Sequence, residues 1–134
     1  MLLKLFTQYY FDRFWSSFES ASGKGSELHY TKNLRDSLEL FFKSKNIKTI
    51  VDAPCGDYNW MGSVINRFPK IDYLGVDVVR PLIIRNETFY GNDKIKFQHA
   101  DICSPEFFFN NCDFLLLRDF LFHLSLKDIK LVID

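Results

Sequence analysis

The sequence predicts an α/β fold built on a parallel sheet, and three observations lead to this class. Four short apolar segments have the character of strands, and segments with helical periodicity separate the first three of them. These three end at carboxylates, Asp52, Asp77 and Asp101, as expected where a parallel sheet binds ligands at the carboxyl ends of its strands. The fourth segment, 112–117, is almost wholly apolar, which is typical of a parallel strand buried on both faces.

Two helices are expected before the sheet. Apolar residues at helical spacing predict an amphipathic helix over roughly the first twenty residues, with a broad aromatic face that packs on the core. These residues are Leu3, Phe6, Tyr10, Phe14 and Phe18. Residues 20–26 are rich in Ser and Gly and predict a loop, for which a solvated linker is one interpretation. Thr31 is expected to cap a second helix that ends near Asn46 and covers the sheet.

The stretch 50–61, with the sequence IVDAPCGDYNWM, organises the rest of the chain. Its β-branched start predicts a strand that ends at Asp52, and a tight turn and an amphipathic helix follow. Gly56 lies in the turn, where a residue without a side chain lets the backbone come close to a ligand. Pro69 is expected to end the helix.

The second and third strands are predicted at 73–77 and 95–100, with a helix from Pro81 to about Gly91 between them. Asp77 lies about twenty residues after the glycine turn, at the end of the second strand. One carboxylate in this place can accept hydrogen bonds from both vicinal hydroxyls of a ribose. Asp77 is therefore a candidate ribose ligand.

Polar residues follow the fourth predicted strand. Arg118, Asp119 and His123 are expected at its carboxyl end, with Asp119 and His123 one helical turn apart. Either could act as a general base, although a histidine among Phe and Leu residues also fits a packing role. Ser125 and Asp128 have the spacing of a capping box, which predicts a helix that continues to the end of the sequence. The segment 107–111 begins with three Phe and either packs under the sheet, which we favour, or forms an exposed aromatic lip.

The stretch 52–61 resembles the first motif of class I S-adenosylmethionine-dependent methyltransferases, an acid followed by three alternating glycines. Asp52 and Gly56 match this pattern, whereas Pro54 and Tyr58 replace the first and third glycines. The longer string DAPCGD-x-NWM is similar to that of a bacterial subgroup in which these departures are the rule. In this subgroup a segment similar to SGKGS at 22–26 precedes the first helix of the catalytic domain. The resemblance therefore implies that the loop 20–26 reaches over the mouth of the cofactor site, which is the alternative to a solvated linker. The resemblance implies a Rossmann-like three-layer sandwich with strand order 3-2-1-4 and helices on both faces.

The resemblance also sets the expected domain organisation. It implies one methyltransferase domain over 1–134, with amino-terminal helices over 1–46 and an incomplete cofactor-binding core over 47–134. The family's last strands would be missing, so the chain would be carboxyl-terminally truncated. The fourth strand would then lie at an open edge of the sheet, and self-association through this strand is expected.

The resemblance assigns a set of residues to S-adenosylmethionine. The cofactor-binding candidates are Asp52, Cys55, Gly56, Asp57, Asp77, Asp101 and Arg118. Asp101 would bind the adenine amino group, or it simply caps a turn. Cys55 is expected to line the site as a small residue, because no His is placed near it by sequence to make it a nucleophile. Asp119 and His123 are the catalytic candidates for an acceptor that must lose a proton.

Several other functions are disfavoured. The turn lacks the glycines of a dinucleotide fingerprint, and no phosphate-loop motif occurs. Lys and Arg number 17, as do Asp and Glu, and no basic cluster indicates a nucleic-acid partner. The 3 Cys form no paired framework and no ligand pair, which favours a cytoplasmic location without a metal site. No apolar run reaches the length of a membrane span.

The expected function is methyl transfer from S-adenosylmethionine to an unidentified acceptor. Most of the acceleration in such a reaction can come from holding the nucleophile and the methyl group in line in a dry pocket. Two alternatives stay open: an inactive, truncated fragment that still binds the cofactor, and an interaction module that depends on a partner and has lost the cofactor.

Overall fold

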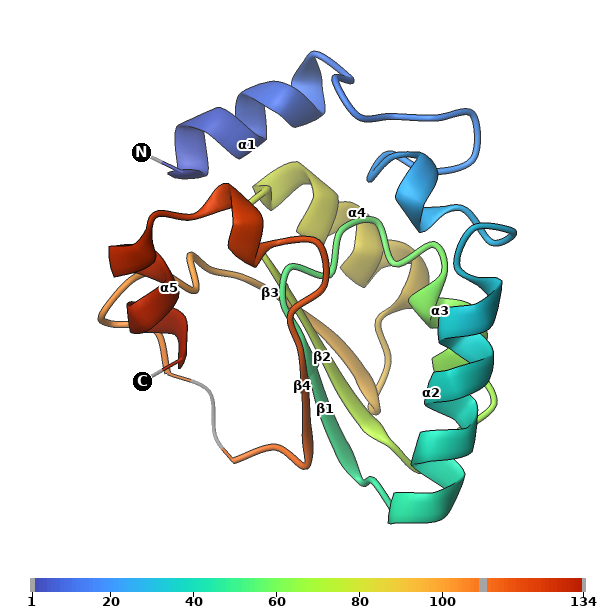
Figure 1. The fold of residues 1–134 in the computed structure, drawn as a ribbon. Helices are drawn as coiled ribbons and strands as arrows, with labels where there is room; N and C mark the ends of the chain where they lie inside the picture. The colour runs from blue at the N-terminus through green and yellow to red at the C-terminus, as the bar shows by residue number, and fades with distance from the viewer. Residues whose placement is uncertain (1, 109–110, 134) are drawn as a thin grey trace.

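A four-stranded parallel sheet forms the centre of the structure, a computed structural model that describes residues 2–108 and 111–133. The strands are β1 (Thr49–Asp52), β2 (Asp72–Asp77), β3 (Ile95–His99) and β4 (Phe114–Leu116). Their order is β3-β2-β1-β4, and each neighbouring pair is parallel. The predicted α/β class and strand order are confirmed. The carboxyl ends of all four strands therefore lie at the same end of the sheet, which is at the top in Figure 1.

The register of the sheet sets which residues meet at this edge. Asp52 ends β1 and lies between Gly75 of β2 and Leu116 of β4. Asp77 ends β2 and pairs with His99 of β3. Two of the predicted acids thus lie side by side at the carboxyl ends of adjacent strands.

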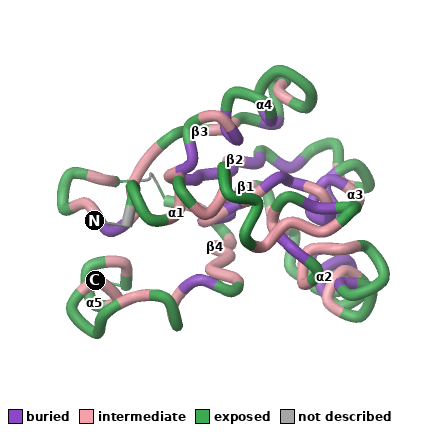
Figure 2. The backbone as a smooth tube through the Cα atoms, turned by 90° about the horizontal axis from the view of Figure 1, so that it is seen from above, coloured by how far each residue is buried: buried purple, intermediate pink, exposed green. Residues whose placement is uncertain are grey.

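Three helices flank the sheet along the chain: α2 (Lys32–Lys45), α3 (Met61–Ile65) and α4 (Arg80–Tyr90). The larger core cluster joins side chains of α2 and α3 to one face of the strands, and Phe42 is typical of it. Phe42 is 3% exposed, and its ring centroid lies 5.6 Å from that of Phe68 and 5.4 Å from that of Phe114. The buried residues gather along β1, β2 and α3 in Figure 2.

The other face of the sheet has a smaller core. Val51, Ala53 and Val76 are its buried members, and partly buried side chains, including that of Phe107, pack against them. Figure 1 places α5 (Leu126–Ile133) on the side of the sheet opposite α2, but no described residue of α5 is buried. The helical cover expected on both faces is therefore thin here.

The prediction that β4 is buried on both faces is wrong. All three residues of β4 have intermediate burial. β4 pairs with β1 on one side, and within 2–108 and 111–133 no strand pairs with its other side. The edge position expected from the strand order 3-2-1-4 is confirmed, and it leaves this almost wholly apolar strand only partly buried. Of the aromatic run expected to pack under the sheet, Phe108 is 85% exposed, and Phe109 lies outside the described residues.

The first helix is shorter than predicted. α1 spans Leu2–Phe11, and the chain turns at Arg13, which has φ of 53°. Phe14 stacks on Tyr9 with a centroid distance of 4.8 Å, and Phe18 is fully exposed. The helical spacing of the aromatic residues therefore continues past the point where the backbone leaves the helix. In Figure 1, α1 crosses above the carboxyl ends of the strands.

Of the two predicted side-chain caps, the one at the start of α5 is confirmed and the one at the start of α2 is wrong. Thr31 immediately precedes α2, but it makes no side-chain cap; its hydroxyl instead donates to the Glu27 carbonyl at 2.9 Å. At the start of α5 the Asp128 N–H donates to Ser125 Oγ at 3.2 Å, as a capping box requires. None of the described helices is long and apolar enough to cross a membrane.

Truncation of Phe42 tests the larger core. We expect Phe42→Ala to lower the free energy of unfolding by about 3 to 5 kcal/mol, because it removes a fully packed ring and leaves a cavity. Urea denaturation would measure the change. Phe18→Ala is the matched control, since a fully exposed ring should change the same quantity by less than about 0.5 kcal/mol. Equal effects of the two substitutions would contradict this core.

Candidate functional site

A cavity of about 680 Å³ opens above the carboxyl ends of β1 and β2. This volume lies within the range of sites that bind small molecules and cofactors. Its floor includes Asp52, Gly56 and Asp77, and its other walls come from α1, residues 22–26 and the segment after β4. The fold therefore brings four separate stretches of sequence to one site.

The turn after β1 is held in a single shape by its neighbours. Gly56 has φ of 56°, a left-handed conformation that favours glycine. Its N–H donates to Asp77 Oδ2 at 3.0 Å, and its carbonyl accepts a hydrogen bond from Asn86 Nδ2 at 2.8 Å. A Cβ atom at this position would also collide with Ser22 Oγ. Glycine is thus required by the turn and by a close neighbour in the protein itself.

Asp77 is a buried acceptor at the cavity. Besides the bond from Gly56, its Oδ1 accepts a hydrogen bond from the Val79 N–H at 2.9 Å. Burial raises the pKa of this carboxyl, and the backbone N–H groups of Val79 and Gly56 oppose that rise. The carboxylate is fixed by two backbone donors, so its position does not depend on a ligand.

Asp52 is a second buried carboxylate on the cavity floor. Its Oδ2 accepts a hydrogen bond from the Tyr73 hydroxyl at 2.7 Å. Burial raises the pKa of Asp52 to about 7, with a smaller upward contribution from the nearby charge of Asp77. In the part of the chain that the structure describes, neither Asp52 nor Asp77 forms an ion pair.

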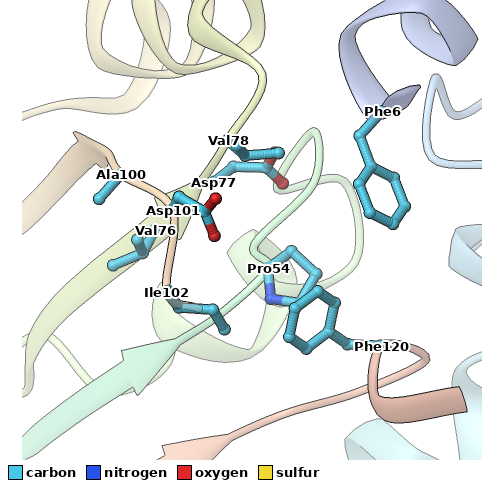
Figure 3. Close-up of a pocket in the computed structure, with 9 residues that line it drawn as sticks. All are labelled: Phe6, Pro54, Val76, Asp77, Val78, Ala100, Asp101, Ile102 and Phe120. Carbon is cyan, nitrogen blue, oxygen red and sulfur yellow. The ribbon is translucent and has the colours of Figure 1, made fainter. Parts of the chain in front are cut away.

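Asp101 lies in a small pocket beside Asp77. This pocket, of about 20 Å³, adjoins the larger cavity, and Figure 3 shows Phe6 and Phe120 on the side opposite the two carboxylates. Asp101 Oδ1 also accepts a hydrogen bond from the Cys103 N–H at 2.9 Å. The residue therefore caps a turn and lines the pocket at the same time, so both predicted roles are compatible with its position.

Cys55 lines the cavity and is buried. Burial raises the pKa of its thiol well above the usual range, and the charges of Asp77 and Asp52 add to this effect. A thiol held in its neutral form is a poor nucleophile. The position therefore agrees with the interpretation of Cys55 as a small lining residue.

Asp57 does not line the cavity, although the sequence assigned it to the cofactor. Its Oδ2 accepts hydrogen bonds from Ser20 Oγ at 2.8 Å and from the Ala21 N–H at 2.7 Å. Its own N–H donates to Ser22 Oγ at 2.9 Å. Asp57 thus binds residues 19–26, a segment that we call the strap, to the Gly56 turn.

Arg118 holds the other end of the strap, and Asn59 binds both of its ends. Arg118 Nη2 donates to the Gly25 carbonyl at 2.8 Å, and the guanidinium lies 5.4 Å from the centroid of the Trp60 ring. Asn59 Nδ2 donates to Glu19 Oε1 at 2.6 Å and to the Ser26 carbonyl at 2.9 Å. Two interpretations of residues 20–26 were open, a solvated linker and a loop that reaches over a ligand site. The structure favours the second, because residues 22–26 line the cavity. Arg118 lies at the cavity, as predicted, but its observed partners belong to the protein.

Asp119 and His123 both line the cavity but do not lie on one helix. Asp119 has φ of 53°, and a separate 3-10 helix, η2 (Leu121–His123), follows it. Asp119 Oδ2 lies 3.0 Å from Arg118 Nη2 in an ion pair. The predicted spacing of one helical turn is therefore wrong, because the left-handed residue redirects the chain between them.

His123 contacts aromatic rings of the amino-terminal segment. Its ring centroid lies 5.8 Å from that of Phe6 and 5.9 Å from that of Trp15. The sequence predicted the aromatic residues of α1 as core, whereas Phe6, Tyr10, Phe14 and Trp15 line the cavity. The spacing of Trp15, immediately after Phe14, was the available signal, since two adjacent aromatic residues do not share one helix stripe.

Tyr73 and Asn86 support the site and were missed from the sequence. Asn86 is fully buried within α4, where its amide holds the Gly56 carbonyl. A polar side chain at a buried helix position was the signal for this role. Across the described ranges, no cluster of three or more acidic, His or Cys side chains could hold a metal ion.

Comparison with known proteins gives one partial relative. No protein-family model matches the chain. Phosphoethanolamine N-methyltransferase of Plasmodium falciparum (isolate 3D7) is 40% identical to it over 55 residues, which are 40% of this chain and 21% of that protein. The match thus spans about a fifth of the relative's length. Together with the parallel sheet in order 3-2-1-4, it supports a Rossmann-like, methyltransferase-like fold.

The buried Asp52 carboxyl generates a pH-dependent prediction. Because its folded pKa of about 7 lies above the ordinary aspartate value, the folded chain holds this proton more tightly than the unfolded chain does. The resulting stability is fully present below about pH 4 and is lost as the pH rises through about 7. We expect the free energy of unfolding to fall between about pH 5 and pH 8 by a few kcal/mol more in the wild type than in Asp52→Asn.

Urea denaturation across this pH range would measure the difference. Asp36→Asn is the control, since a hydrogen bond from Lys32 lowers the pKa of the exposed Asp36 carboxyl. That variant should keep the wild-type pH dependence. Identical slopes for the wild type and Asp52→Asn would contradict the assignment of a raised pKa to Asp52.

Proposed function

We propose that the chain binds S-adenosylmethionine above β1 and β2 and transfers its methyl group to an acceptor. The observation that carries the proposal is the Gly56–Asp77 pair. A glycine turn and a buried carboxylate are joined by a hydrogen bond of 3.0 Å at the cavity floor. This arrangement leaves Asp77 as a fixed acceptor for ribose hydroxyls. The partial methyltransferase relative supports the same cofactor.

The charge of the cavity fits a cationic cofactor. Asp52 is 3% exposed and Asp77 is 7% exposed, and no ion pair involving either occurs among the described residues. Buried carboxylates are stabilised by a nearby positive charge, which a sulfonium and an ammonium group would supply. In this proposal Asp77 holds the ribose, Asp101 lies near the base and Asp52 faces the positive charges.

The proposed chemistry needs few protein groups. When bound, S-adenosylmethionine supplies an electrophilic methyl group. The residues of this chain would hold the acceptor in line with it, and the strap and the aromatic walls would exclude water. For an acceptor that loses a proton, His123 is the better candidate base, because Asp119 is already paired with Arg118.

The two alternatives predict different measurements. An inactive fragment would bind S-adenosylhomocysteine without turnover, whereas an interaction module without the cofactor would not bind it.

We also propose that the protein is cytoplasmic and has no nucleic-acid or membrane partner. This proposal is supported by the balance of 17 basic and 17 acidic residues and by 3 Cys that are free in the described structure.

The cofactor assignment is tested by calorimetric titration with S-adenosylhomocysteine. We expect Asp77→Ala to weaken binding by about 1.5 to 3 kcal/mol, the scale for loss of charge-assisted hydrogen bonds. Asp72→Ala is the matched control, because this exposed residue begins the same strand at its opposite end. Unchanged affinity in a folded Asp77→Ala variant would remove Asp77 from the site. No binding by the wild type would overturn the proposed cofactor.

We also propose that two copies associate through β4. Its outer edge has no strand partner in the described ranges, and its side chains are only partly buried. Sedimentation at several concentrations should show a mass that rises with concentration. We expect Leu115→Lys to shift the equilibrium towards the monomer, because a charge on an edge strand opposes pairing. A wild-type mass that is independent of concentration and equal to the monomer would contradict this proposal.

A further inference from the structure

The cavity has two kinds of wall. Its floor is polar and fixed, with Asp52 and Asp77 at the ends of adjacent strands. Its outer wall is aromatic and is formed by side chains of the amino-terminal segment and of η2. These side chains are Phe6, Tyr10, Phe14, Trp15, Phe122 and His123. The proposed cofactor accounts for the floor. The outer wall has the composition of a site for a second molecule.

The rings of the outer wall already contact one another. Phe6 and Trp15 lie 5.7 Å apart between centroids, and Phe122 and His123 lie 4.3 Å apart. Yet Phe14 is 67% exposed and Phe122 is 72% exposed. Such exposed rings at the opening of a cavity gain free energy when a flat apolar molecule covers them. A ligand with an aromatic ring therefore fits this wall.

The charges of the lining disfavour an anionic acceptor. Three carboxylates, those of Asp52, Asp77 and Asp119, line the cavity. Two basic side chains, Lys24 and Arg118, belong to the described lining. Arg118 already binds Asp119 and the Gly25 carbonyl, so Lys24 is left to bind an anion. Phosphate recognition generally uses a bidentate arginine or several donors. A phosphorylated acceptor would meet more repulsion than attraction here.

A cationic acceptor is disfavoured by the reaction itself. A protonated amine has no lone pair with which to attack a methyl group, and the transferred methyl group already lies on a positively charged sulfur. A neutral hydroxyl on an aromatic ring has the lone pair and needs only a base. His123 lies within the aromatic wall, and the described structure gives it ring contacts but no side-chain hydrogen bond or ion pair. No hydrogen bond within the described structure therefore occupies its ring nitrogens, and a general base must lie within hydrogen-bond reach of the proton it removes.

We infer that the outer wall binds an acceptor with a phenolic ring and that the chain methylates its hydroxyl oxygen, an inference that rests on the proposed cofactor. A bond forms between the phenolic oxygen and the methyl carbon as the bond between methyl and sulfur breaks, which leaves a neutral thioether. The phenolic proton passes to the imidazole of His123 and then to solvent. Phe14 and Trp15 contact the ring, and His123 contacts the reacting hydroxyl.

The test compares two ligands of matched shape, p-cresol and 4-methylcyclohexanol. Calorimetric titrations are carried out on the full chain with and without saturating S-adenosylhomocysteine. We expect p-cresol to bind roughly three- to tenfold more tightly than its saturated analogue. Trp15→Leu should reduce this preference for p-cresol. Phe18→Leu is the control and should leave the preference unchanged, because Phe18 is fully exposed and does not line the cavity. Transfer of a labelled methyl group from S-adenosylmethionine to p-cresol is the second measurement.

The His123→Asn variant separates binding from proton transfer. At saturating p-cresol, so that any change in affinity does not enter, it should transfer the labelled methyl group at least about tenfold more slowly than the wild type. Equal affinity for the two ligands, or tighter binding and methylation of phosphoethanolamine, would overturn the inference. A chain that binds S-adenosylhomocysteine without preferring p-cresol would overturn the inference alone. A chain that prefers p-cresol through Trp15 but does not bind S-adenosylhomocysteine would overturn the proposed cofactor and the transfer step, while the aromatic-ring site would stand.

Discussion

The hydrogen bond from the Gly56 N–H to the Asp77 carboxylate is the constraint on which the site depends. It joins the turn after β1 to the end of β2, and the register of these strands already brings their carboxyl ends side by side. The left-handed backbone of Gly56 makes the geometry possible, and the buried amide of Asn86 holds the same residue from α4. A ligand would therefore meet an acceptor that is positioned before it binds.

The neighbouring residue of the motif has a different task. Asp57 binds the strap through Ser20 and Ala21, while Arg118 binds the strap's other end from beyond β4. Consecutive residues of one turn thus organise the floor and the cover of the cavity. The amino-terminal segment is part of the site because a carboxylate and a guanidinium hold it in place, each through charge-assisted hydrogen bonds that include one to the backbone of the strap.

The floor and the outer wall are held by different forces. Hydrogen bonds and strand pairing fix the floor, whereas α1 reaches the segment after β4 through ring contacts such as that of Phe6 with His123. No hydrogen bond joins residues 2–15 to the sheet in the described structure. Ring contacts are less directional than hydrogen bonds, so the outer wall can adapt to a ligand more readily than the floor. This division suits a common cofactor and a variable acceptor.

The sequence by itself determined the α/β class, the approximate bounds of α2 and of the four strands, and the placement of Asp52, Asp77 and Asp101 at strand ends. These features follow from local periodicity, and the strand order followed from the resemblance of the motif. Only the tertiary structure decided that the residues of β4 are no more than partly buried, that α1 ends at Phe11, and that Asp57 and Arg118 hold the strap. The way in which the strap is held depends on partners 36 and 93 positions away, in the bonds from Ala21 to Asp57 and from Arg118 to Gly25. No local pattern records such a contact, because it exists only once the chain has folded.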